Sequence, residues 1–286
     1  MERASFTQAE QLLGKGDYYV AERTFPPVPV SSQEGHSALY CNLQLLRGVG
    51  PRTEEKLKSQ GCHDLASLTK HGRWGRAACD VIAAIERRDA PALVQCGAPE
   101  IDLVSFYSPT DIGFVDIETT GLYSTQPLFL VGVMACRDDG TMLLKQFLAR
   151  SYEEEAAVLC AVRCELERLR VIATYNGRRF DLPYIRDRMA YHGVSFTMDQ
   201  FHVDILRLAR RLYRSMLPDC RLVTVASHLL GYDRHGDIPS HMIPEVYHDF
   251  VKSRNPALIR PILEHNAMDI HALALILANM QHRARG

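Results

Sequence analysis

The chain has 286 residues and a mass of 32.3 kDa, which suits one large domain or a main domain with a smaller companion. Hydrophobic residues make up 47% and charged residues 23%, with a formal net charge of -1. This balance is that of an ordinary globular protein and excludes a strongly basic one, so any basic surface must be local. The start has no apolar signal-peptide core, and no segment approaches the roughly 18 uninterrupted apolar residues of a membrane span. We therefore expect a cytoplasmic protein that does not contact a membrane.

Residues 1–40 combine a strand-like piece, YYVAERTF, with the proline- and serine-rich stretch PPVPVSSQEG. The second stretch lacks apolar periodicity, so the sequence predicts an N-terminal arm or linker. From there to residue 95 the pattern becomes helical, with glycines at the joins. Residues 41–95 are therefore expected to form a compact all-helical module.

Within this module, LLRGVGPRTEEKL resembles a helix-hairpin-helix motif. Gly48 and Gly50 allow a tight turn, and the N–H groups at the start of the following helix suit one phosphate of a nucleic-acid backbone. Arg52, Lys56 and Lys58 add positive charge nearby. We expect sequence-independent contact with nucleic acid, although such hairpins also serve as protein-packing units, and two neighbouring glutamates weaken the positive field.

After the linker CGAPEID, strand and helix patterns alternate, which predicts an α/β or α+β domain over residues 101–286. The expected strands are IGFVDIE, FLVGVMAC, TMLLKQFLA and RVIATYN. The expected helices cover residues 153–170, 182–192, 203–215, 221–230 and 257–282.

The eight cysteines include no Cys-x-x-Cys pair. They are predicted to be reduced core residues, and a metal or cluster site among the four that precede residue 100 is the alternative.

The strand GFVDIETTGL places two carboxylates on one face, because side chains at i and i+2 point to the same side. Burying two like charges costs several kcal/mol unless a proton or a cation neutralises one of them. Asp116 and Glu118 therefore indicate either a divalent-metal site or a solvated strand end just before a turn.

Two further acids occur in comparable settings. Asp181 follows a strand that ends at Asn176, and it begins the next helix, where it could also act as a helix cap. His265 and Asp269 share one face of a largely apolar helix, and an exposed ion pair is the alternative there.

Taken together and in this order, DIETTGL, NGRRFD and HNAMD resemble the acidic motifs of the DEDD superfamily of 3′-to-5′ exonucleases, which have a ribonuclease-H-like fold. The resemblance covers Ile112 to the C-terminus. It is strongest to YprB-type ribonuclease-H-like proteins, with VDILRLARRLYRSMLPDCRLVTVASHLLG and DIPSHMIPEVYHDF as further landmarks, and weaker to the proofreading domains of family-B DNA polymerases. It implies a central mixed sheet flanked by helices.

The resemblance also implies that Asp116, Glu118, Asp181 and Asp269 bind two Mg²⁺ or Mn²⁺ ions. Asp116 would bridge both ions, Glu118 and Asp269 would complete the site for the nucleophile, and Asp181 would support the other. His265 stands four residues before Asp269, where relatives have a tyrosine at that spacing or a histidine at five. It is expected to act as a general base or to orient the attacking water.

Basic residues near these motifs are candidates for substrate contact. Arg178 and Arg179 directly precede the acid of the second motif, and Asn176 and Phe180 are either substrate-side or packing positions. Four arginines share a face of the helix that follows VDI, where they either track phosphates or form a solvated surface: Arg207, Arg210, Arg211 and Arg214.

The sequence thus predicts a metal-dependent nuclease that hydrolyses phosphodiester bonds of DNA or RNA, most simply a 3′-to-5′ exonuclease with two metal ions. The alternatives are a non-catalytic nucleic-acid-binding or scaffold protein, and an endonuclease that acts on structured or hybrid nucleic acid. Protein partners and oligomeric state are not predicted.

Overall fold

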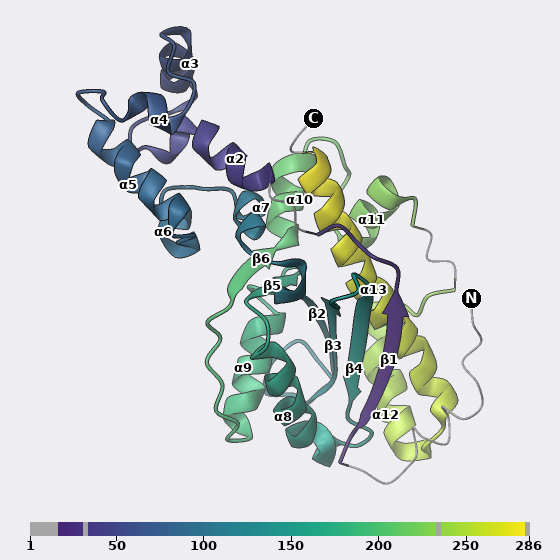
Figure 1. Ribbon diagram of the computed structural model, residues 1–286. Coiled ribbons are helices and arrows are strands. Elements are labelled where there is room, and N and C mark those ends of the chain that lie inside the picture. Colours follow the sequence, from purple (N-terminus) through teal and green to yellow (C-terminus); the bar gives the residue numbers. More distant parts are fainter. Residues whose placement is uncertain (1–16, 31–33, 233–235, 284–286) are drawn as a thin grey trace. The chain divides into compact units, whose positions relative to one another are not determined.

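The computed structural model describes residues 17–30, 34–232 and 236–283. Residues 1–16 and 31–33 of the predicted N-terminal arm lie outside the described residues. The chain divides into two compact units, which are described separately (Figure 1). The larger unit takes the chain up to Val28 and Pro109–Asn279, and the other takes Pro29–Ser108 and the residues from Met280 onward.

The larger unit is built on a six-stranded sheet in the order β1-β4-β3-β2-β5-β6. Strands β1 to β4 pair antiparallel, whereas β5 and β6 run parallel to β2, so the sheet is mixed, as predicted. The strands are β1 (Tyr19–Phe25), β2 (Ile112–Thr119), β3 (Leu128–Cys136), β4 (Met142–Leu148), β5 (Val171–Thr174) and β6 (Phe201–Asp204).

The four predicted strands are confirmed as β2 to β5, and two more complete the sheet. Strand β1 comes from the segment expected in an arm and pairs along its whole length with β4. Strand β6 has only four residues and pairs only with β5. Its sequence FHVD is too short to show an alternating pattern, and part of it was assigned to the helix that follows.

Helices cover both faces of the sheet (Figure 1). The predicted helices are found as α8 (Glu155–Leu166), α9 (Asp181–Tyr191), α10 (Ile205–Tyr213), α11 (Leu222–Leu230) and α13 (Pro256–Arg283). Helix α12 (Ile243–Ser253) was not predicted, although Pro244 in its first turn is a typical helix-start signal. None of the described helices is long and apolar enough to cross a membrane.

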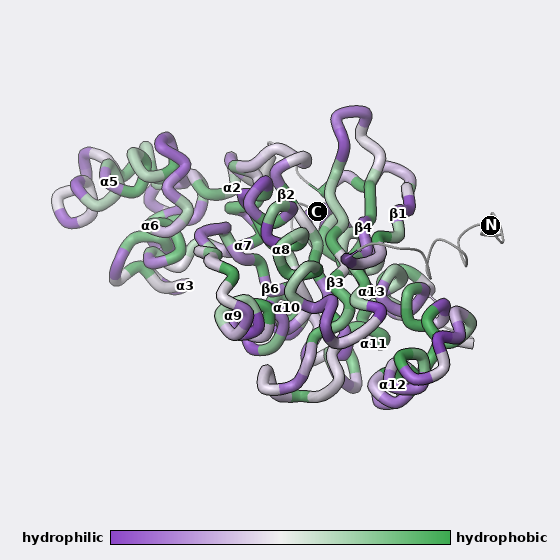
Figure 2. Tube along the Cα trace, turned by 90° about the horizontal axis from the view of Figure 1, so that it is seen from below, coloured by the Kyte–Doolittle hydropathy of each residue, from purple (hydrophilic) through white to green (hydrophobic). Residues whose placement is uncertain are grey.

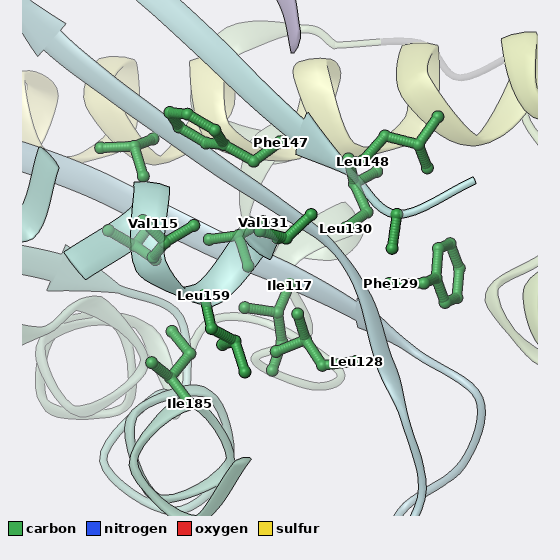
Figure 3. Packing of buried hydrophobic residues seen from close by; sticks show 14 of the residues in the cluster. Val115, Ile117, Leu128, Phe129, Leu130, Val131, Phe147, Leu148, Leu159 and Ile185 are labelled. Atoms are coloured by element: carbon green, nitrogen blue, oxygen red, sulfur yellow. The ribbon is translucent and has the colours of Figure 1, made fainter. Parts of the chain in front are cut away.

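The two faces of β2 have opposite character because side chains alternate along a strand. Val115 and Ile117 are buried and pack in one apolar cluster with Leu159 of α8 and Ile185 of α9 (Figure 3). Burial of each such side chain contributes about 1.5–3 kcal/mol. Asp116 points to the opposite face, where Asn266 of α13 contacts it. The apolar face thus fixes the strand, and the polar face is left for chemistry.

A buried ion pair joins α8, α9 and β3. Arg188 donates to Glu155, both side chains are almost fully buried, and His192 also contacts this carboxylate. Glu155 in turn accepts from the backbone N–H of Leu128, the first residue of β3. Strand β3 is hydrophobic, whereas α12 alternates between polar and apolar residues (Figure 2).

The second unit is built from helices. Within residues 41–95, the predicted module, they are α3 (Pro51–Ser59), α4 (Leu65–Leu68), α5 (Gly75–Glu86) and α6 (Ala90–Gln95). Helix α2 (Glu34–Cys41) instead comes from the segment expected to be an arm or linker, and α7 (Glu100–Leu103) follows the predicted module. Their core is apolar and includes Leu39, Leu43, Leu68 and Ile85. Gly75 allows the turn before α5 to close, since an added Cβ would lie 2.4 Å from the carbonyl oxygen of Thr69.

The prediction that the cysteines are core residues is wrong. All eight are free thiols, four are exposed and the others are only partly buried. Cys160 and Cys164 illustrate the reason, because they lie on the solvent side of α8 although apolar residues surround them in the sequence.

Candidate carboxylate site

The centre of the candidate site is β2, the strand between β3 and β5. Asp116 is partly buried, and its Oδ2 accepts a hydrogen bond of 2.8 Å from Asn266 Nδ2. Burial raises the pKa of the Asp116 carboxyl well above its usual range, and the charges of Glu118, Asp269 and Asp181 raise it further. The four carboxylates that the sequence singled out are therefore close enough to interact electrostatically.

Glu118 shares this environment. Burial raises the pKa of its carboxyl well above the usual range, followed by the charges of Asp269, Asp181 and Asp237. Since its partners come from different elements, the cluster depends on the fold and not on one local motif. The interpretation of Asp116 and Glu118 as an independent, solvated strand end does not account for this mutual effect.

Asp181 is the first residue of α9 and is only 4% exposed. Burial raises the pKa of its carboxyl to about 7, and the charge of Asp204 adds to the rise, while backbone hydrogen bonds, including one with Ile117, oppose it. Phe180 occupies the position that precedes the helix and makes no side-chain cap. The capping position therefore belongs to Phe180 and not to Asp181, for which a helix cap was the alternative.

His265 and Asp269 lie on α13, where His265 is 5% exposed. Its Nδ1 is 2.8 and 2.9 Å from the two carboxylate oxygens of Asp237, and its Nε2 is 3.5 Å from Asp269 Oδ2. Ser240 Oγ lies 3.5 Å from the same Nε2. Burial argues against an exposed ion pair and favours a ring held in one orientation by Asp237.

Asp237 was missed as an individual residue by sequence reasoning. It lies in the loop before Ser240–Met242 and reaches His265 only through the tertiary fold. The one signal available was its place at the start of DIPSHMIPEVYHDF, a segment already noted in the resemblance.

The donor set fits a hard divalent cation, because carboxylate oxygens are the ligands that such ions prefer. The charges of Asp181 and Asp269 raise the pKa of both Asp116 and Glu118, so the group forms a region of negative charge that bound cations would relieve. As placed, no three His, Cys, Asp or Glu side chains within residues 17–30, 34–232 and 236–283 are arranged to hold a metal ion. The chemistry of the site thus fits, although the side chains are not arranged for coordination.

Asn176 and the two arginines after it lie in the connection between β5 and α9. Asn176 adopts a left-handed backbone with φ of 68°, and its N–H donates to Asp204 Oδ1 at 2.9 Å. Arg178 and Arg179 are exposed. Phe180 packs near Tyr184, with ring centroids 5.5 Å apart. Asn176 therefore shapes the turn that presents the arginines.

On α10, the four predicted arginines are all exposed, while the residues between them include buried Leu208 and Ala209. The predicted basic face therefore exists as a surface. Its members are Arg207, Arg210, Arg211 and Arg214.

The glycine turn that the sequence singled out lies in the second unit, directly before α3. Gly48 has φ of +85°, and Gly50 precedes α3, which begins at Pro51. Arg52 and Lys56 are exposed. Lys58 pairs with Glu54 at 2.9 Å, so one of the two glutamates is engaged in an ion pair within α3. These residues belong to the second unit and not to the unit that carries the carboxylates.

A mixed sheet with carboxylates on its central strand and on the helices beside it is the arrangement of ribonuclease-H-like proteins. Residues 113–281, which make up more than half of the chain, match the family RNase_H_2 of the RNase_H superfamily. The chain belongs to this superfamily.

One relative is the uncharacterized protein YprB of Bacillus subtilis (strain 168). It is 31% identical over 187 residues, which cover 62% of this chain and 43% of that protein. The chain therefore spans less than half the length of this relative. Among solved structures, this chain is similar to the family B DNA polymerase of Pyrobaculum calidifontis. The match covers 60% of this chain and 24% of the polymerase chain, with 18% sequence identity and a TM-score of 0.48.

Proposed function

We propose that this protein is a divalent-metal-dependent nuclease that hydrolyses DNA or RNA, acting as a 3′-to-5′ exonuclease. The carrying observation is the group of four carboxyls, Asp116, Glu118, Asp181 and Asp269, of which the first three have raised pKa values. In a member of the RNase_H superfamily, such a group supports metal-dependent phosphodiester hydrolysis.

These four carboxylates would hold two Mg²⁺ or Mn²⁺ ions. When bound, such a pair lowers the pKa of an attacking water and neutralises charge on the leaving oxygen. Asp116 and Glu118 come from a rigid strand, while Asp181 and Asp269 come from helices on which neighbouring side chains are buried. The scaffold therefore fixes the backbone positions from which the four donors project.

His265 would accept the proton of the attacking water. With Asp237 accepting from Nδ1–H, the neutral ring has its free lone pair at Nε2, on the side of Asp269. Nε2 accepts the proton, and the Asp237 carboxylate stabilises the resulting imidazolium. His265 thus serves as general base in this proposal, and Asp237 positions it.

Exposed arginine and lysine side chains and the backbone of the glycine turn would contact the nucleic-acid substrate. Arg178 and Arg179 follow Asn176 in the turn before Asp181, and Gly48, Gly50, Arg52 and Lys56 supply a separate backbone-directed site. Such contacts accept any base sequence, as an exonuclease requires.

The test offers 5′-labelled single- and double-stranded DNA and RNA to the wild-type protein and to Asp116→Ala, with Mg²⁺ or Mn²⁺. A ladder that shortens from the 3′ end, absent with Asp116→Ala, supports the proposal. Asp138→Ala, which removes an exposed carboxylate between β3 and β4, is the matched control and should cleave normally.

Full metal-dependent hydrolysis by Asp116→Ala would refute the proposal. Cleavage of covalently closed circular substrates would favour an endonuclease instead. Binding without cleavage in either metal would favour a non-catalytic nucleic-acid-binding protein.

A further inference from the structure

Asn266, the residue after His265 on α13, is fully buried yet polar at its tip. Its Nδ2 donates to Asp116 Oδ2 at 2.8 Å and approaches the backbone oxygen of the same residue at 3.4 Å. A buried amide of this kind normally has every polar atom paired. The oxygen of Asn266 therefore requires a donor of its own.

Gln146 of β4 supplies that donor. It is 3% exposed, and its Nε2 donates to Asn266 Oδ1 at 2.9 Å and to the Leu263 carbonyl oxygen at 2.8 Å. The chain of hydrogen bonds ends on the backbone carbonyl of Leu263 at one side and on the backbone carbonyl and carboxyl oxygens of Asp116 at the other, and backbone carbonyl oxygens only accept. Both amides must therefore direct N–H toward Asp116, and neither can flip without placing two acceptors face to face.

The sheet register makes room for this contact. Asp116 pairs with Gly132, and Gly132 pairs with Gln146, so the three residues form one row across β2, β3 and β4. A Cβ at Gly132 would lie 2.3 Å from Asn266 Oδ1 and 2.2 Å from Ile270 Cδ1. The missing side chain on β3 therefore lets an amide from α13 link β4 to β2.

We propose that Gln146 and Asn266 form an amide relay that fixes the orientation of the Asp116 carboxylate for metal binding. They are positioning residues, and this inference rests on the proposed function of the carboxylates. The hydrogen bond occupies one side of Oδ2 and prevents the carboxylate from rotating, which leaves its remaining lone pairs in a defined direction. Neither amide contacts the reacting atoms.

The test replaces Asn266 by Leu, which keeps the branched shape and removes the amide. Mn²⁺ binding is measured by isothermal titration calorimetry without nucleic acid, and kcat and KM are measured with substrate. Loss of a residue that orients a metal ligand typically lowers metal affinity or activity about 10- to 100-fold, and a loss of this size is expected here. The KM for nucleic acid should not change, because the relay does not touch the substrate.

The matched control is Asn279→Leu, the same substitution on the same helix. Within the described part of the chain, the side-chain oxygen of Asn279 is buried without a hydrogen-bond partner, so its loss should leave Mn²⁺ affinity unchanged. Gln146→Met removes only the upstream donor and keeps Asn266 in place. It should weaken Mn²⁺ binding in the same direction but less, and it tests the relay even where Asn266→Leu does not fold.

Unchanged Mn²⁺ affinity in folded Asn266→Leu or Gln146→Met would overturn the relay. The outcome is separable from that of the proposed function, because binding is measured without turnover. If the wild-type protein binds Mn²⁺ more tightly than Asn266→Leu but cleaves no nucleic acid, the nuclease proposal is refuted and the relay is kept. A wild-type protein that binds no Mn²⁺ would overturn both.

Discussion

Replacing Asp181 by Asn should stabilise the metal-free protein at neutral to alkaline pH and abolish hydrolysis. The Asp181 carboxyl is buried, and its pKa is raised from 3.8 to about 7. As pH rises, the unfolded chain loses this proton near its pKa of 3.8, whereas the folded protein keeps it until about pH 7. The free energy of unfolding therefore falls between these two pH values and stays low above them, since the charged carboxylate must then be buried. Asn has nearly the same shape and never carries the charge.

The magnitude follows from the two pKa values. A difference of this size corresponds to about 4 kcal/mol at full ionisation, which is an upper bound because its neighbours titrate together with it. For a domain of this size each kcal/mol shifts Tm by about 2–4 °C, so Asp181→Asn should raise Tm by several degrees at about pH 8. At about pH 4 the folded state holds the proton and the unfolded state is still roughly half protonated, so little of the penalty has developed and the gain should be small.

Thermal unfolding in EDTA at both pH values measures this effect. Asp187→Asn is the matched control on the same helix, because Asp187 is exposed and contacts Ser124 and Arg186, which lower the pKa of its carboxyl. Its replacement should leave Tm unchanged or lower it slightly at about pH 8, where a carboxyl with a lowered pKa contributes its stability. A Tm gain for Asp181→Asn that is absent at about pH 8, or equal at both pH values, would refute the reasoning.

Two other substitutions test the remaining parts of the proposal. Asp237→Asn should lower kcat about 10- to 100-fold, because it removes the charge that orients His265, and a wild-type kcat would contradict that role. Arg52→Ala should weaken nucleic-acid binding and reduce the slope of log affinity against log salt by about 1, measured by fluorescence anisotropy. Arg87→Ala, an exposed arginine at the end of α5, is its control, and equal effects of the two would argue against a specific contact at the glycine turn.

Much of the fold could be predicted because its central strands and main helices have clear periodicity. Val115 and Ile117 alternate with Asp116 and Glu118, and this alternation predicts which face of the strand packs in the core and which face carries the acids. The prediction that the cysteines are buried was wrong, because apolar neighbours in the sequence do not reveal which side of a helix faces solvent, as Cys160 shows.

What the sequence did not reveal depends on long-range contacts. Asp237 reaches His265 across a loop, and Gln146 reaches Asn266 from another strand, so no local pattern contains either pair. Gly132 appeared as an ordinary residue inside a strand, and its importance becomes visible only where α13 approaches it. Short elements such as β6 are likewise defined by their neighbour and not by their own residues.

The position of β1 in the chain has a consequence for biosynthesis. Its residues leave the ribosome before the helical unit, before β2 and β3, and before β4, the one strand with which it pairs. A nascent β1 therefore remains without its partner while helices α2 to α7 of the second unit emerge. The charges of Glu22 and Arg23 on this strand should discourage pairing with another nascent chain in that interval.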